Sequence, residues 1–149
     1  MSAILVDTNV LVYAYDPTDG AKRSQAGAVL RKMMAEDTAV LSAQILGEFF
    51  VTVTRKIPSP LTVLEAQERI TNYLSSAPVY NVTPLIVLEA VRGVHRYQLH
   101  YYDALIWATA RLNQIPDVLT EDAEHGRILE GIRYLNPFHP EFEMSLLEV

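Results

Sequence analysis

Four acidic residues lie in separate parts of the chain, each beside an apolar segment: Asp7, Glu48, Asp103 and Asp122. A carboxylate held near an apolar core loses hydration, and a partner charge or a divalent cation must compensate for that loss. No lysine or arginine lies within two residues of any of the four. This arrangement favours a metal ion as the compensating charge, and carboxylates around a metal ion indicate phosphodiester chemistry.

Such a site needs no nucleophile from the protein. One or two Mg²⁺ or Mn²⁺ ions can bind a phosphate oxygen, lower the pKa of a bound water and stabilise the leaving oxygen. The chain has no cysteine, no Gly-x-Ser-x-Gly element, no phosphate-binding glycine loop and no His-Glu-x-x-His pattern, so other common hydrolytic sites lack their residues. Each acid also has an ordinary interpretation, as a helix cap, an acid of a first helical turn or a solvated helix residue.

Composition limits the class of protein. With 149 residues, 50% of them hydrophobic and 20% charged, the chain is expected to form one globular domain over residues 1–149. It lacks a signal-peptide pattern and any apolar run near the ~20 residues of a membrane span, so we expect a soluble cytoplasmic protein. The net charge of −6 argues against tight binding of free nucleic acid, but the four acids contribute −4 of it and two divalent ions would neutralise them.

Short apolar runs alternate with amphipathic segments along the chain. Strands are expected at 3–6, 38–41, 80–82, 117–119 and 132–135. Helices are expected at 8–15, 21–35, 43–56, 62–75, 84–97 and 102–113. Ser42, Thr62 with Glu65, and Thr83 before Pro84 are typical helix starts. The alternation predicts an α/β fold whose central, mainly parallel sheet of four to five strands is covered on both faces.

In sheets of this kind, sites form beyond the carboxyl ends of the strands. Asp7 and Asp122 directly follow expected strands, and Glu48 lies in the helix after the second strand. Asp103 lies at the start of a helix, where the helix dipole favours a carboxylate. We therefore expect all four acids to converge on one edge of the sheet.

Short motifs follow one another in a fixed order: Val6-Asp7-Thr8-Asn9-Val10-Leu11, Gly47-Glu48-Phe49, Tyr102-Asp103-Ala104-Leu105-Ile106, Thr120-Glu121-Asp122 with His125-Gly126, and Asn136-Pro137-Phe138. In this order they resemble the PIN domain family, and within it the VapC-type toxin ribonucleases of type II toxin–antitoxin systems. The resemblance spans residues 4–138. Tyr102 is a small departure, because Trp or Phe is also common there.

The resemblance implies an α/β/α sandwich and a Mg²⁺- or Mn²⁺-dependent endoribonuclease that hydrolyses RNA with metal-activated water. By position it assigns metal binding and catalysis to the four acids: Asp7, Glu48, Asp103 and Asp122. Asp7 and Asp103 would be direct ligands, and the other two would act through water or on a second ion. Three further residues would orient the acids by hydrogen bonding: Thr8, Asn9 and Thr120. Members of the family often form homodimers and are commonly inhibited by a protein antitoxin, whose tail blocks the acidic pocket.

Other interpretations stay open. Arg92 and Arg96 lie four residues apart, on one face of the expected helix, and could bind RNA together with nearby tyrosines. A solvated basic face is the ordinary alternative. The whole domain could be a binding module that does not turn over, or an aspartate-based phosphatase. The phosphatase is disfavoured because Asn9 stands where such a site needs a second aspartate.

Overall fold

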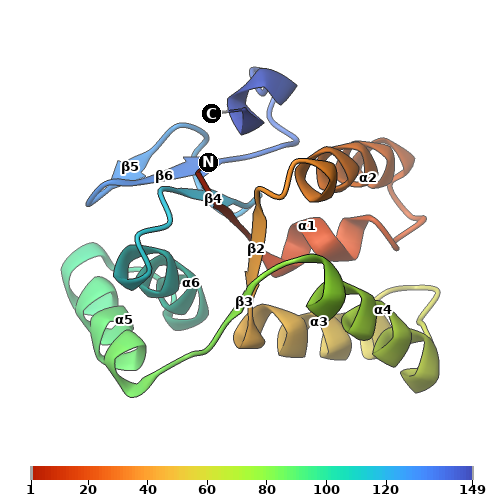
Figure 1. The fold of residues 1–149 in the computed structure, drawn as a ribbon, viewed down its shortest axis with the longest axis horizontal. Helices are drawn as coiled ribbons and strands as arrows, with labels where there is room; N and C mark the ends of the chain where they lie inside the picture. Colours follow the sequence, from red (N-terminus) through yellow and green to blue (C-terminus); the bar gives the residue numbers. More distant parts are fainter. Residues whose placement is uncertain (1, 149) are drawn as a thin grey trace.

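The computed structural model describes residues 2–148, and within them the centre is a six-stranded sheet in the order β3-β2-β1-β4-β6-β5 (Figure 1). The strands are β1 (Ile4–Val6), β2 (Ala39–Ser42), β3 (Val79–Tyr80), β4 (Asp117–Leu119), β5 (Ile128–Leu129) and β6 (Ile132–Leu135). All neighbouring strands from β3 to β6 pair in parallel, and β5 runs antiparallel to β6. The predicted α/β class with a mainly parallel sheet is confirmed.

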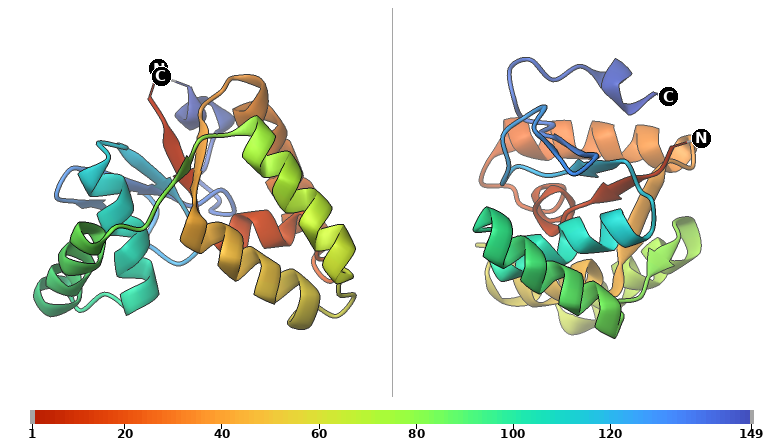
Figure 2. Two further views of the ribbon diagram at one scale, coloured as in Figure 1. Left: turned by 60° about the horizontal axis from the view of Figure 1, so that its bottom comes forward. Right: turned by 90° about the vertical axis from the view of Figure 1, so that its left-hand side faces the viewer.

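The helices are α1 (Thr8–Tyr13), α2 (Gly20–Ala35), α3 (Ala43–Arg55), α4 (Val63–Ser76), α5 (Pro84–Tyr97) and α6 (Tyr101–Leu112), followed by a short 3₁₀ helix (Met144–Leu147). Figures 1 and 2 show α5 and α6 packed together on one side of the sheet, with α1 and α2 on the other. None of the helices within residues 2–148 is long and apolar enough to cross a membrane.

The predicted helix starts are confirmed, because each cap makes the expected hydrogen bond. The Ser42 hydroxyl accepts from the backbone N–H of Ile45, and Thr62 and Glu65 form a complete capping box. Thr83 caps α5, and Pro84 occupies its first turn, where a missing N–H costs nothing.

The sheet has one strand more than the four to five expected. Strand β5 has two residues and joins β6 through a tight turn in which Glu130 and Gly131 have φ angles of 47° and 84°. Two residues are too few for an alternating pattern to be detected, so the hairpin has no periodic signal in the sequence. The third strand is also shifted, from the expected 80–82 to Val79–Tyr80.

The order of the strands creates a switch point between β1 and β4. The chain moves outward from β1 to β2 and β3, and then returns to place β4 on the other side of β1. Val6 pairs with Leu119 at the carboxyl ends of these two strands, and the backbone N–H of Asp7 donates to the Leu119 carbonyl at 2.9 Å. The residues that follow β1 and β4 are therefore held side by side.

Helices α5 and α6 approach closely because one residue at their contact has no side chain. A Cβ placed on Gly93 would lie 2.8 Å from Cζ3 of Trp107, which is fully buried. The Trp107 indole N–H donates to the Leu129 carbonyl at 3.2 Å and so ties α6 to the β5–β6 hairpin. This packing fixes α6, and with it the first turn that carries Asp103.

Candidate metal centre

Asp7 occupies the junction between β1 and α1 and is only 6% exposed. One carboxylate oxygen accepts from the backbone N–H of Thr8 at 2.6 Å. The other accepts from the Thr120 hydroxyl at 2.8 Å. Both donors are neutral, so they orient the carboxylate without neutralising it.

Asp122 lies in the loop that follows β4 and is linked to Asp7 through two supporting residues. The Asn9 side-chain amide donates to an Asp122 carboxylate oxygen at 3.0 Å. The Thr120 hydroxyl, which donates to Asp7, accepts from the backbone N–H of Asp122 at 3.0 Å. Asn9 and Thr120 thus make the hydrogen bonds expected of residues that orient the acids. Thr8 contributes its backbone N–H, and its hydroxyl has no hydrogen-bond partner among residues 2–148.

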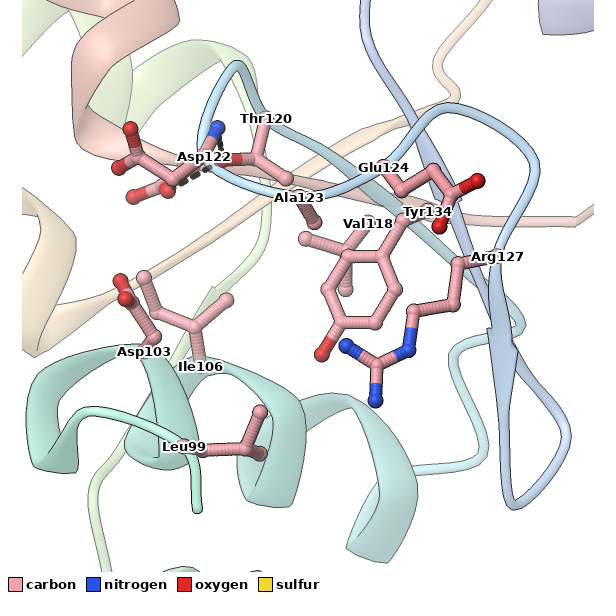
Figure 3. Close-up of a pocket in the computed structure, with 11 residues that line it drawn as sticks. Leu99, Asp103, Ile106, Val118, Thr120, Asp122, Ala123, Glu124, Arg127 and Tyr134 are labelled. Carbon is pink, nitrogen blue, oxygen red and sulfur yellow. Dashed lines mark hydrogen bonds between the residues drawn. The ribbon is translucent and has the colours of Figure 1, made fainter. Parts of the chain in front are cut away.

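Asp103 comes from the other side of the site, in the first turn of α6. Asp7, Asp103 and Asp122 each offer a carboxylate oxygen within 4.8 Å of the other two. Figure 3 shows the Asp103 and Asp122 carboxylates at one end of a cavity, one from α6 and one from the loop after β4. We call Asp7, Asp103 and Asp122 the acidic trio.

Glu48 stands beside the trio. It lies in α3 and is half-buried, and all four acids line one hollow of about 360 Å³. Its carboxylate accepts from the Gln44 side-chain amide at 2.6 Å, and the same amide donates to the Tyr102 carbonyl at 3.0 Å. The convergence expected from the sheet is therefore observed, since all four acids line this hollow and three of them lie within 4.8 Å of one another. The roles of these residues in metal binding stay a prediction.

Burial raises the pKa values of Asp7, Glu48 and Asp103, and repulsion from neighbouring carboxylates adds to each rise. Desolvation raises the pKa of Asp7 to about 7, against the hydrogen bonds from Thr120 and Thr8, and the charges of Asp122 and Asp103 add to the rise. Partial desolvation also raises the pKa of Asp103, with a further contribution from Asp122. The pKa of Glu48 is raised chiefly by desolvation, which outweighs the hydrogen bond from Gln44.

The donor set fits a hard divalent cation. Its oxygens all come from carboxylates, which are the ligands that such cations prefer. Among the described residues, no ion pair joins a lysine or arginine to any of the four acids. A divalent cation would remove the repulsion that raises the pKa values of Asp7 and Asp103.

Arg92 and Arg96 lie away from the acids. Arg92 pairs with Glu89 at 2.6 Å and with Glu130 at 2.9 Å. The Arg96 side chain donates to the Tyr97 hydroxyl at 3.1 Å. Neither arginine lines a hollow that the acidic trio lines, and their contact with RNA stays a prediction.

Sequence reasoning did not place several polar residues beside the acids, among them Gln44, Lys56, Arg127 and Tyr134. The spacing of four residues between Gln44 and Glu48 is a usable signal, because it places both on one helix face. Arg127 and Tyr134 have no such signal in their spacing, because it is the fold of the hairpin beginning at β5 that brings them close to the acids.

Comparisons with known proteins relate the chain to a family and to several solved structures. The PIN domain family model matches residues 4–130. A toxin–antitoxin complex from Klebsiella pneumoniae has a similar structure, with a TM-score of 0.67 and 21% identity over 91% of this chain and 98% of that chain. VapC20 of Mycobacterium tuberculosis, described as a sarcin-ricin loop cleaving toxin, aligns with a TM-score of 0.61 and 20% identity over 78% of this chain and 87% of its own.

A DNA-bound VapBC complex from Salmonella typhimurium aligns with a TM-score of 0.65 and 16% identity, over 90% of this chain and 97% of that chain. At identities this low, the structural similarity establishes a common fold. No curated protein sequence matches the chain.

Proposed function

The chain belongs to the PIN domain family, and we propose that it is a metal-dependent endoribonuclease and the toxin of a type II toxin–antitoxin pair. The observation that carries the proposal is the acidic trio, whose oxygens meet within 4.8 Å where β1 and β4 end. Solved structures with this fold include toxin–antitoxin complexes and a toxin described as cleaving the sarcin-ricin loop, which supports RNA as the substrate.

The acidic trio would hold Mg²⁺ or Mn²⁺, with Glu48 beside it. When bound, such an ion supplies positive charge for the phosphate and leaving oxygens and makes a water more acidic. Thr120 and Asn9 keep the carboxylates of Asp7 and Asp122 in fixed orientations through the hydrogen bonds described above. Glu48, one oxygen of which accepts a hydrogen bond from Gln44, would accept a proton from water, a role that its raised pKa supports.

The proposal includes two protein partners and a location. A protein antitoxin would reach the acidic hollow with a cationic side chain, since the four acids that line it pair with no lysine or arginine in the described part of the chain. A second copy of the chain would form a homodimer. We also propose that the protein acts in the cytoplasm, where its RNA substrate and its antitoxin would meet.

The first experiment measures RNA cleavage. Antitoxin-free protein is incubated with total RNA in Mg²⁺, in Mn²⁺ or in excess chelator, and the new RNA ends are sequenced. We expect discrete cleavage sites for the wild type, and none for Asp7→Asn, Asp103→Asn or the chelated sample. Glu68→Gln, which removes an exposed acid of α4, is the matched control and retains cleavage. Full activity in chelator or in both aspartate variants would refute the proposal.

A second measurement does not depend on cleavage. An ion that binds only the folded state raises the free energy of unfolding by RT ln(1 + [L]/Kd), and the melting temperature rises with it. We expect Mn²⁺ to raise the melting temperature of the wild type and of Glu68→Gln, but not that of Asp103→Asn. A Mn²⁺-dependent rise without cleavage of any RNA would support a non-catalytic metal-binding module instead.

A further inference from the structure

A cavity of about 150 Å³ opens beside the acidic trio (Figure 3). All three acids of the trio line it, and Figure 3 shows Asp103 and Asp122 at one end and Arg127 and Tyr134 at the other. The wall between them is apolar and is formed by Leu99, Ile106, Val118 and Ala123. Pockets for drug-sized molecules start at roughly 300 Å³, so this cavity has room for a single small ring system.

Arg127 and Tyr134 are fixed opposite each other by the backbone. The N–H of Tyr134 donates to the Arg127 carbonyl at 2.8 Å, and the N–H of Gly126 donates to the Tyr134 carbonyl at 2.8 Å. Gly126 has a φ of 86°, a conformation that L side chains rarely adopt. In Figure 3 both side chains extend from the sheet toward α6. The β5–β6 hairpin and the turn before it therefore set the backbone positions of both residues, of which Tyr134 is buried and Arg127 is exposed.

The polar ends of these two side chains have no partner in the described part of the chain. Neither the Arg127 guanidinium nor the Tyr134 hydroxyl makes a side-chain hydrogen bond or an ion pair within residues 2–148. Burial raises the pKa of Tyr134 to about 12, with Arg127 acting against the rise and Asp103 adding to it. The hydroxyl is thus protonated at neutral pH and can donate or accept a hydrogen bond.

We propose that this cavity, here named the base cavity, binds the nucleobase next to the bond that is cut, and that Arg127 and Tyr134 select the base. The inference rests on the proposed ribonuclease function. An apolar wall with a few convergent polar groups is typical of a site for a flat neutral ring. A guanidinium presents parallel N–H donors that match O6 and N7 of guanine, so guanine is the base that we expect.

A phosphate group fits the base cavity poorly. Glu124, which is not one of the acids assigned to the metal ion, also lines it, and its carboxylate would repel a second phosphate beside the one at the metal. The apolar wall offers a phosphate no donors to replace its hydration. A neutral base is not repelled by a carboxylate and loses less hydration than a phosphate, and it can pack against the apolar wall.

Cleavage selectivity is the first test. A pool of randomised oligoribonucleotides is cut by the wild type, Arg127→Met and Tyr134→Phe, and the ends are sequenced. We expect guanine to be enriched at one position beside the cut, and the enrichment to fall about tenfold or more in Arg127→Met and less in Tyr134→Phe. Arg31→Gln, which removes an exposed arginine of α2, is the matched control and keeps both activity and enrichment.

An oligonucleotide with an abasic nucleotide at the selected position separates base from phosphate recognition. We expect the wild type to cut it about tenfold more slowly than the guanine version, and Arg127→Met to cut the two at similar rates. If Arg127→Met slows both substrates equally, Arg127 holds a phosphate and the proposal is wrong. If the wild type enriches another base and both variants lose that enrichment, the base cavity is supported but guanine is the wrong base. Unchanged enrichment in both variants would overturn the base cavity itself.

A binding experiment separates this inference from the proposed function. Guanosine is titrated into the metal-free wild type while NMR signals of Ile106, Val118 and Ala123 are followed, with ribose 5-phosphate as the comparison. We expect guanosine alone to shift these signals, and to shift them less in Arg127→Met. Guanosine binding without RNA cleavage would contradict the proposed ribonuclease function and would support the base cavity. Cleavage without guanosine shifts would overturn the base cavity alone.

Discussion

Replacing Asp7 with asparagine is expected to stabilise the metal-free protein above pH 7, although it removes a residue on which the proposed activity depends. The Asp7 carboxyl is 6% exposed, and burial raises its pKa from 3.8 to about 7. In the unfolded chain, water solvates the carboxylate and the pKa returns to its ordinary value. Between pH 3.8 and about pH 7, the Asp7 carboxyl is therefore protonated in the folded protein and ionised in the unfolded chain.

The magnitude follows from this difference in pKa. About three pH units at ~1.4 kcal/mol each give about 4 kcal/mol, which the wild type loses as the pH rises from 3.8 to 7. The sign is that of a raised carboxyl pKa: stability is greatest below pH 3.8 and falls until about pH 7. Asparagine carries no charge and escapes this loss, but its amide can replace only part of the hydrogen bonding to Thr8 and Thr120, at a cost of about 1 kcal/mol. The variant is then more stable by about 3 kcal/mol at pH 8, and slightly less stable near pH 4.

Urea denaturation in excess chelator from pH 4 to pH 8 measures the effect, with Glu68→Gln as the control for loss of an exposed acid. The same series in Mn²⁺ reverses the ranking at pH 8, because the ion stabilises the wild type by about 4.1 kcal/mol at a concentration 1,000 times its Kd. A difference between the wild type and the variant that does not change with pH would refute the reasoning. So would a metal-free variant that is less stable at pH 8.

Three further predictions concern other parts of the molecule. Thr120→Val removes the hydroxyl shared by two acids and is expected to weaken Mn²⁺ binding about 10- to 100-fold by isothermal titration calorimetry; unchanged affinity would contradict this. Arg96→Met is expected to weaken RNA binding in fluorescence anisotropy more than Arg92→Met, because Arg92 is already paired with two glutamates; equal losses would contradict it. Gly93→Ala places a Cβ 2.8 Å from Trp107 and is expected to lower the free energy of unfolding in urea by about 1–3 kcal/mol; a neutral change would show that the helices separate freely.

The strands and helices that carry the acids could be predicted because their signals are local. Apolar runs predicted β1 and β4, and cap residues predicted the starts of α3, α4 and α5. Once two parallel strands end side by side, the residues that follow them are neighbours whatever the rest of the chain does. Asp7 and Asp122 meet for this reason, so their convergence could be predicted from the sequence.

The remainder of the site depends on distances that no local pattern encodes. Asp103 reaches Asp7 because Gly93 lets α5 pack tightly on α6 and Trp107 ties α6 to the hairpin. The hairpin depends on positive φ angles at Gly126, Glu130 and Gly131, and only two of those positions carry the glycine that could signal a turn. Arg127 and Tyr134 are therefore seen to face the acids only in the folded structure.

The energetics of Asp7 also explain why its hydrogen bonds are all to neutral groups. A lysine or arginine partner would lower its pKa and stabilise the metal-free protein, but it would then compete with a cation for the same carboxylate oxygens. Donors such as the Thr8 N–H and the Thr120 hydroxyl orient the oxygens and leave the charge uncompensated. A bound cation would offset this loss of stability, because its binding would displace the proton and remove the repulsion within the acidic trio. Such a site would gain cation affinity at the expense of stability, and we therefore expect stability and cation binding in this protein to be coupled through one buried carboxyl group.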